Sequence, residues 1–595
     1  MFSKLPSEII VHVTIYLPTI TDIANLAQTC QRLHKIVNTE ESAIFRSFVQ
    51  NQFPSTYTPS FWKDAARVLT ARSRALDRLG IIGRFVIPPA TTIRIGLNEP
   101  MRLDNPTLGY RPAIDSYEIW NGDRWAERRE VLAWGAGHQI VMRIKQSGSR
   151  PKEQWVSFND VKEASSYDDI CGLHVLQSEF GKTTGVEHMI FGRMRGGLVH
   201  VALSVDNATH EYKRKFMTSG DLLERTDMED HTLAAHFDNG SVALYQLEND
   251  HKEVEPFAWV MVGSEVDRSR SRYSKLLSSS RIAVATGQIE NSLSINTMSP
   301  DGICLDREIG LNSLDSGDQV GRSVHANVTA IAPLNSHPYA GSPGDVFLAT
   351  WGDRTIRLHD LRSPNSYEAT YQDTTDSNLI YSVQPFGHDR FLAGAAGNAI
   401  LKIFDLRMSN AYSHLDAHFP PTKSQISPKP AKRNGAQYPR KDFSMFLSSQ
   451  IPSAAPRSSR ANRRRPYRGP IYTLSTPSPS SPTVYAGIVD AVVRLDFAST
   501  DDLTGPSRDW YEYNLDLGVE TGQPSVPVET DNVFRMAGYE RPDPGDFTTT
   551  SKLRHQHGFW YPEQRYLNNG TGAGWDRRWE PLEKPGAWRR RDNCK

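Results

Sequence analysis

The sequence predicts a mainly β fold, a seven-bladed β-propeller, preceded by a small all-α helical module. Three observations support this prediction. Apolar stripes at helical spacing occupy the first forty or so residues, and a strand–turn–strand pattern recurs along the middle of the chain. The composition of the 595 residues, with 41 Gly, 37 Pro and aromatic residues throughout, favours many short strands and turns in more than one domain.

Three short helices are predicted at the N-terminus. Pro6 stands where a first helical turn tolerates a missing N–H, and Ile9, Val13 and Leu17 recur every four residues on one face. Thr21 is expected to cap a second helix. The second and third apolar stripes contain Ile23, Leu26, Ala27, Cys30, Leu33, Ile36 and Val37.

So much apolar surface in a segment of about fifty residues predicts docking on another protein, because so short a segment barely buries its own core. The stretch from Leu5-Pro6 to Ile36 resembles an F-box, and the resemblance implies packing on a Skp-type adaptor. The positions that the resemblance places at or just behind this contact are Leu5, Pro6, Ile9, Leu26, Cys30 and Leu33. The alternative is a helical bundle that packs only on the rest of this chain.

The middle of the chain is a degenerate repeat. Segments 346–362 and 390–407 read as strand, tight polar turn and strand, and they resemble WD repeats. They carry His359 and Phe404 where that family usually has Trp, and we expect either ring to fill the same space between blades. Weaker copies of the hairpin are 132–144, 189–205, 232–247, 281–297 and 483–497.

These hairpins are spaced from the low forties upward, which matches a four-stranded propeller blade of about 40 to 45 residues plus loop insertions. A β-sandwich is the competing all-β architecture, but it is not expected to repeat one hairpin so regularly. The resemblance therefore implies a seven-bladed WD-type propeller.

The predicted domain organisation follows from these patterns. We expect an F-box at 1–50, a helical linker at 51–85, the propeller at 86–515 and an aromatic-rich, partly disordered extension at 516–595. Within the propeller, 409–468 reads as a disordered basic insertion, and Trp510-Tyr-Glu-Tyr513 is a candidate for the outer strand of the last blade. From Lys423 to Arg468 there are twelve Lys or Arg residues against one acid, so this loop is a nuclear import signal, a weak contact for a polyanion, or merely a solvated loop.

The overall charge and the cysteines exclude several classes of function. Lys plus Arg and Asp plus Glu both number 68, so there is no global signal for nucleic acid or a membrane, and neither is an expected partner. The four cysteines are too far apart for a metal knuckle and too few for a disulfide framework, which favours the cytoplasm or nucleus. No cofactor, metal site or catalytic motif is predicted.

The resemblance implies a non-catalytic subunit of a Skp–cullin–F-box ubiquitin ligase, in which the propeller binds a target protein. Two alternatives remain: a WD receptor for the other large cullin ligase class, suggested by the Asp-Leu-Arg endings at 360–362 and 405–407, and a non-ubiquitin scaffold. The turns between second and third strands are expected to form the target-binding face of the propeller. Their candidate residues are His138, Arg195, Asn239, Arg354 and Asn398.

Overall fold

The computed structural model describes residues 5–581 with internal gaps, the longest at 262–272, 311–325, 408–441, 448–466, 516–532, 542–552 and 557–574. The shorter gaps are 39–42, 55, 57, 60, 99–100, 103–109, 123, 149–150, 178–184, 249–250, 289, 300–301, 336–340, 505–507 and 535. Residues 1–4 and 582–595 also lie outside the description.

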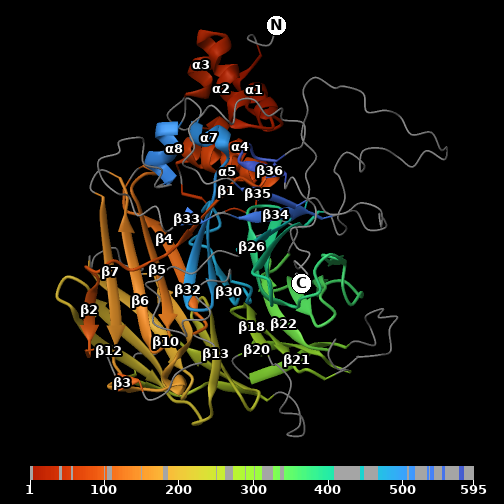
Figure 1. Ribbon diagram of the computed structural model, residues 1–595. Helices are drawn as coiled ribbons and strands as arrows, with labels where there is room; N and C mark the ends of the chain where they lie inside the picture. Colours follow the sequence, from red (N-terminus) through yellow and green to blue (C-terminus); the bar gives the residue numbers. More distant parts are fainter. Residues whose placement is uncertain are drawn as a thin grey trace, which may run out of the picture.

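Seven β-sheets form a ring around a central channel. The labelled helices lie together at one end of the molecule, as Figure 1 shows. Neighbouring sheets touch through their first strands in a closed circle, from β4 through β9, β13, β18, β22, β26 and β30 back to β4. The prediction of a seven-bladed propeller preceded by a small helical module is therefore confirmed.

Each blade is written from its inner strand outward. Blade 1 contains β4 (Ile114–Trp120), β5 (Arg128–Ala136), β6 (Gln139–Gln146), β7 (Lys152–Asn159) and β2 (Ile93–Gly96). Blade 2 contains β9 (Ile170–Leu176), β10 (Val186–Arg193), β11 (Leu198–Ser204), β12 (Thr209–Phe216) and β16 (Glu253–Val254). Blade 3 contains β13 (Leu223–Glu229), β14 (Thr232–Phe237), β15 (Ser241–Gln246) and β17 (Ala258–Met261).

The remaining blades follow in chain order. Blade 4 contains β18 (Tyr273–Ser278), β19 (Arg281–Ala285), β20 (Leu293–Ser299) and β21 (Gly302–Ile309). Blade 5 contains β22 (Val328–Pro333), β23 (Val346–Trp351), β24 (Ile356–Asp360) and β25 (Ala369–Tyr371). Blade 6 contains β26 (Ile380–Phe386), β27 (Arg390–Ala395), β28 (Ile400–Asp405), β29 (Phe443–Phe446), β34 (Ala537–Glu540), β35 (Leu553–Gln556) and β36 (Trp579–Pro581). Blade 7 contains β30 (Thr473–Ser475), β31 (Thr483–Ile488), β32 (Ala491–Phe497), β1 (Ile81–Phe85) and β33 (Val533–Phe534).

The outer strand of the last blade comes from the beginning of the chain. Strand β1 pairs antiparallel with β32, from Ile81 opposite Phe497 to Phe85 opposite Val493. The sequence predicts residues 81–85 as part of a helical linker, but they form this strand. It also predicts the outer strand near Trp510, where the chain instead forms the helices α7 (Thr500–Thr504) and α8 (Arg508–Leu515). Strand pairing between distant segments leaves no local pattern, so the error was not visible in the sequence.

The expected insertion at 409–468 also contains a structural element. Strand β29 lies inside it and pairs with β28, from Ile400 opposite Phe446 to Ile403 opposite Phe443. The alternation of apolar and polar residues in Phe-Ser-Met-Phe is strand-like, but it covers only four residues between Pro-, Lys- and Ser-rich stretches. The two parts on either side of β29, 408–441 and 448–466, lie outside the described residues.

The aromatic rings at the usual Trp positions of blades 5 and 6 pack as the sequence predicts. His359 stacks on Phe347 with ring centroids 5.0 Å apart, and Phe404 stacks on Phe391 at the same distance. His359 is buried, and its two nitrogens bind the Trp351 indole N–H at 3.4 Å and the Ser366 carbonyl at 2.6 Å. Because burial disfavours the charged ring, the pKa of His359 falls from about 6.5 to about 3.

The helical module comprises α1 (Ser7–Thr14), α2 (Ile20–Thr29), α3 (Gln31–Val37), α4 (Ala43–Gln52) and α5 (Trp62–Arg78). The cap of α2 is Thr19, whose hydroxyl accepts the Asp22 N–H at 3.3 Å while the Asp22 carboxylate accepts the Thr19 N–H at 3.1 Å. The prediction of Thr21 as this cap was therefore wrong by two positions.

Helix α5 joins the module to the propeller. Arg72 on this helix is buried and donates hydrogen bonds to the carbonyls of Pro479 at 2.6 Å and Ser481 at 3.0 Å, in the loop between β30 and β31. Asp77 on the same helix binds Arg390 of blade 6 at 2.8 Å. Gly80 follows at a close approach, because a Cβ there would lie 2.8 Å from the Cα of Ser499.

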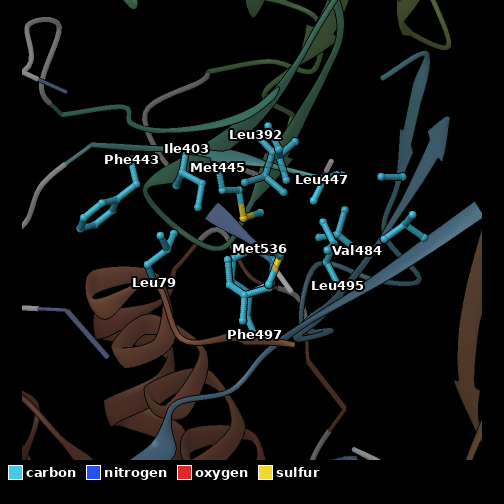
Figure 2. Packing of buried hydrophobic residues seen from close by; sticks show 14 of the residues in the cluster. Leu79, Leu392, Ile403, Phe443, Met445, Leu447, Val484, Leu495, Phe497 and Met536 are labelled. Atoms are coloured by element: carbon cyan, nitrogen blue, oxygen red, sulfur yellow. The ribbon is translucent and has the colours of Figure 1, made fainter. Parts of the chain in front are cut away.

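The largest hydrophobic cluster lies where this helix, blades 6 and 7 and the C-terminal segment meet. Figure 2 shows Leu79 from the end of α5 facing Phe443 and Met445 of β29, with Met536 between them and Phe497 of blade 7. All five are buried. The junction between box and propeller is thus a continuous core and not a loose linker.

Replacing Met445 by Ala should lower the free energy of unfolding by about 2–5 kcal/mol, because Met445 is fully buried in this cluster. Chemical denaturation of the full chain measures the change. Leu305→Ala is the matched control, since Leu305 lies on the outer strand of blade 4 with an exposed side chain, and it should change stability by less than about 0.5 kcal/mol. A tolerated Met445→Ala would show that β29 is not a structural part of blade 6.

His359 predicts a pH dependence of stability. Its pKa is lower in the fold than in the unfolded chain, so its contribution is complete above pH 6.5 and is lost as the pH falls toward 3. His359→Phe keeps a ring at this position but removes the titration. Below pH 6, the free energy of unfolding of the wild type should therefore fall by about 1.4 kcal/mol per pH unit relative to that of the variant. Unfolding curves from pH 4 to 8 test this, and parallel curves would contradict it.

Candidate functional site: an exposed helix and the opposite propeller face

Helix α1 presents an apolar face to solvent. Ile9, Val13 and Tyr16 are 46%, 36% and 69% exposed, while Ile10 and Thr14 on the other face are fully buried. The stripe that the sequence showed at Ile9 and Val13 is therefore not the inward face of the helix. An apolar helix face that the described part of the chain leaves exposed suits docking to a partner.

The six residues expected at the adaptor contact divide into two layers. Pro6 and Ile9 are exposed, Leu5, Leu26 and Cys30 are partly buried, and Leu33 is 3% exposed. The last four belong to, or pack against, one hydrophobic cluster shared by α1 to α5. They lie behind the exposed surface and hold it in place.

The second candidate surface is the propeller face on the far side from these helices. In each blade the inner strand begins beside the turn that joins the second and third strands, as Ile114 opposite Trp134 shows in blade 1. The opposite ends of the strands carry the loops that α5 contacts through Arg72 and Asp77. A target on the turn face therefore does not compete with the helical module.

The five turn residues proposed from the sequence lie at turns of this face, but several of them stabilise the turns themselves. The Asn239 carboxamide accepts the Ser241 N–H at 2.8 Å and donates to Asp221 at 2.8 Å. Asn398 adopts a left-handed conformation with φ 58°, and the His138 carbonyl accepts a hydrogen bond from Arg193 at 3.0 Å. These positions serve turn geometry first.

The two turn arginines differ in their surroundings. Arg195 is 65% exposed, yet its guanidinium already binds the Asp168 carboxylate at 3.0 Å and lies 3.2 Å from the Ser165 hydroxyl. Arg354 is exposed at a left-handed position with φ 69°, and it pairs with no carboxylate of the described residues. Arg354 is therefore the freer of the two charges.

A channel of about 1150 Å³ runs along the propeller axis, lined by the inner strands. None of the five turn residues lines it. Its wall in blades 1 to 4 carries Asp115, His174, Asp227 and Lys275, whereas blades 5 to 7 contribute side chains such as Ile331, Val383 and Leu474. The channel has one charged wall and one mainly apolar wall.

Burial shifts the titration of the charged wall. It raises the pKa of Asp115 to about 6 and lowers the pKa of His174 to about 4, so His174 is neutral at physiological pH. Burial opposes the charge of Lys275, but the adjacent Asp227 carboxylate raises the Lys275 pKa above its usual value. Lys275 thus keeps its charge beside Asp227.

Side chains of this wall also join neighbouring blades. Asp115 accepts the Val175 N–H of blade 2 at 2.8 Å, and Asp227 accepts the Leu276 N–H of blade 4 at 2.6 Å. The His174 ring binds the Thr226 hydroxyl of blade 3 at 2.9 Å. These groups are explained by inter-blade hydrogen bonding and need no catalytic role.

The mouth of the channel on the turn face holds residues that the sequence reasoning missed. They lie at or just before the first residues of inner strands, and they are Tyr110, Arg111, Arg225, Tyr273, Tyr381 and Tyr472. The Arg111 guanidinium lies over the Tyr472 ring at 5.1 Å, and that of Arg225 over Tyr273 at 4.1 Å. The missed signal was an aromatic or basic residue near the start of five of the seven inner strands, which only a correct blade boundary reveals.

Neither a metal-binding cluster of His, Cys, Asp or Glu nor a helix long and apolar enough to cross a membrane occurs among the described residues.

Comparison with protein families bears on the helical module. No curated protein matches the chain. Residues 2–50 match the F-box-like family, and this range contains α1 to α3 and most of α4. The chain therefore begins with an F-box-like domain, which is followed by a seven-bladed β-propeller.

Proposed function

We propose that this protein is a substrate-recognition subunit of a Skp–cullin–F-box ubiquitin ligase. The observation that carries the proposal is the exposed apolar face formed by Ile9 and Val13 of α1 and by Tyr16 just after the helix, within the F-box-like domain, which no described residue covers. A Skp-type adaptor is the partner that F-box domains bind, and its cullin assembly acts in the cytoplasm and nucleus. We assign adaptor binding to this face, with Leu5, Leu26, Cys30 and Leu33 supporting it from behind.

In this role the chain binds the target and fixes its distance from the conjugating enzyme, and it takes no part in the covalent chemistry. A substrate receptor raises the effective concentration of an acceptor lysine near a charged conjugating enzyme, and this requires a fixed geometry between adaptor and target. The buried Arg72 contacts and the Asp77–Arg390 ion pair supply such rigidity at the junction. The adaptor and the target then bind at opposite ends of one rigid body.

The target is proposed to bind the turn face, where Arg354 and Arg195 are candidates for gripping a phosphorylated or acidic segment. The guanidinium of Arg354, which pairs with no carboxylate of the described residues, supports this role, whereas Arg195 would have to share or leave Asp168.

The receptor role in the other large cullin ligase class rests on the Asp-Leu-Arg endings. In both endings the arginine folds back on its own aspartate, as Arg362 does on Asp360 at 2.7 Å and Arg407 on Asp405 at 2.7 Å. These arginines are thus engaged within the chain, and we rank this alternative, like the non-ubiquitin scaffold, below the Skp-dependent role.

Replacing Ile9 and Val13 by Asp should abolish co-purification with a Skp-type adaptor, because two charges would then be desolvated in an apolar contact. The control is Gln28→Asp, an exposed position on α2 outside this face, which should retain the adaptor. Unchanged thermal unfolding of the double variant shows that the fold survives. Undiminished adaptor recovery by the double variant would refute the proposed function.

Charge reversal at Arg354 together with Arg195 should weaken capture of the physiological target at least about tenfold while adaptor binding is unchanged. Affinity purification under a proteasome block, followed by quantitative mass spectrometry, measures both. Of the two single variants, Arg354→Glu should weaken target capture more than Arg195→Glu, because Arg195 is already neutralised by Asp168. Equal target recovery by all variants would move the site away from these turns.

A further inference from the structure

Arginines stacked on aromatic rings recur in this protein, and some of them also bind a carboxylate. Among the described residues there are four such ring–arginine–carboxylate arrangements, formed by Arg143 with Glu130, Arg193 with Asp160, Arg357 with Asp353, and Arg541 with Asp442. In Arg357, for example, the guanidinium lies 5.4 Å from the Trp351 ring and 2.5 Å from the Asp353 carboxylate. The ring fixes the plane of the guanidinium, so that its edge meets the carboxylate.

The channel mouth has two arrangements that contain the ring and the arginine but lack the carboxylate. Arg111 lies over Tyr472 at 5.1 Å, and Arg225 lies over Tyr273 at 4.1 Å. Among the described residues, neither guanidinium has a hydrogen bond or an ion pair beside its ring contact. Arg111 is exposed and Arg225 is partly buried with its Nε shielded from solvent, so a ligand would reach the terminal N–H groups.

The two stacks stand on different walls of one channel. Arg111 precedes β4 of blade 1 and stacks on the residue before β30 of blade 7, whereas Arg225 belongs to β13 of blade 3 and stacks on the first residue of β18. All four residues line the same cavity. Tyr381, which is 38% exposed, stacks on Tyr472 and extends the aromatic surface toward blade 6.

The charge of the channel decides between carboxylate and phosphate as the missing anion. Its lining contains five carboxylates, Asp115, Asp169, Glu224, Asp227 and Glu229, against four cations, Arg111, Arg225, Lys275 and Arg390. This lining has no excess of positive charge, which the binding of a doubly charged phosphate would require. Each stack also offers a single arginine, whereas a phosphate is commonly bound by several. A single carboxylate at each stack completes the arrangement that the chain uses elsewhere.

We propose that the channel mouth binds an extended peptide segment of the target through two acidic side chains, one on the Arg111–Tyr472 stack and one on the Arg225–Tyr273 stack. Phosphorylation of the target is not required. A peptide fits better than a small dicarboxylate, because a cavity of about 1150 Å³ exceeds the usual size of a small-molecule site and its arginines stand on separate walls. The tyrosines bind the apolar parts of the segment between its acids. The inference deepens the proposed function by naming the chemistry of the target.

The test uses the full chain and short fluorescein-labelled peptides on a Gly-Ser frame, each with two residues of one kind at a series of separations. The two residues are glutamate, glutamine, lysine or phosphoserine, and binding is measured by fluorescence anisotropy. We expect binding of the glutamate peptides at a restricted range of separations, weaker binding of the glutamine and lysine peptides, and no gain of more than about threefold from phosphoserine. Free glutarate in excess should compete poorly.

The variants are Arg111→Gln and Arg225→Gln, alone and together. Each single change should weaken glutamate-peptide binding at least about tenfold. Lys213→Gln on the outer strand of blade 2 is the control and should leave it unchanged. Arg111→Lys and Arg225→Lys, which keep the charge but lose the planar stack, should bind with intermediate affinity. The thermal unfolding midpoint of every variant reports on folding.

Equal glutamate-peptide binding by the double glutamine variant and the wild type would overturn the inference. A phosphoserine peptide that binds more than about tenfold tighter than its glutamate counterpart, with a preference lost in the variants, would replace carboxylate by phosphate and also overturn it. Adaptor pull-down from the same preparations is independent of these outcomes. Loss of adaptor binding in the wild type would refute the ligase role and leave the peptide site standing.

Discussion

The pairing of β1 with β32 is the interaction on which the rest of the structure depends. A propeller is a ring of sheets, and its first and last blades stay together only if the chain provides a contact that closes the ring. Here residues 81–85 cross from the helical module into blade 7, where Ile81, Ile82 and Phe85 are buried. Each such side chain contributes about 1.5–3 kcal/mol of burial, so the closure is a stable seam.

The same junction sets the position of the F-box-like domain. Because α5 ends one residue before the turn into β1, any movement of the helix would pull on the strand that closes the ring. The C-terminal segment reinforces the junction: the Trp579 indole donates to the Leu79 carbonyl at 2.7 Å, and the Asp576 N–H donates to the Arg78 carbonyl at 2.7 Å. Residues 576–579 of the aromatic extension thus have a structural role in holding the F-box-like domain in one orientation on the propeller.

Ring closure also explains the division of charges in the channel. The inner strands of the blades lie side by side without a continuous backbone hydrogen-bond ladder between blades, so side chains such as Asp115, Asp227 and His174 make the inter-blade bonds. These groups are satisfied within the protein. Arg111 and Arg225 are different because, among the described residues, only aromatic rings hold them, and a ring orients a charge without neutralising it.

Local patterns were sufficient for much of this protein. The seven hairpins at 132–497 and the helices of the N-terminal module depend on residues close together in the chain, so their periodicity predicts them. The apolar stripe at Ile9 and Val13 was visible in the same way, although the sequence did not reveal that this stripe faces solvent. Only the tertiary structure decided which distant strand closes blade 7, that β29 lies within the basic insertion, and which arginines have no carboxylate partner among the described residues. The physical reason is that these pairings depend on how separate segments of the chain come together in space, over about forty residues for β28 and β29 and over about four hundred for β1 and β32, and no local sequence pattern encodes those distances.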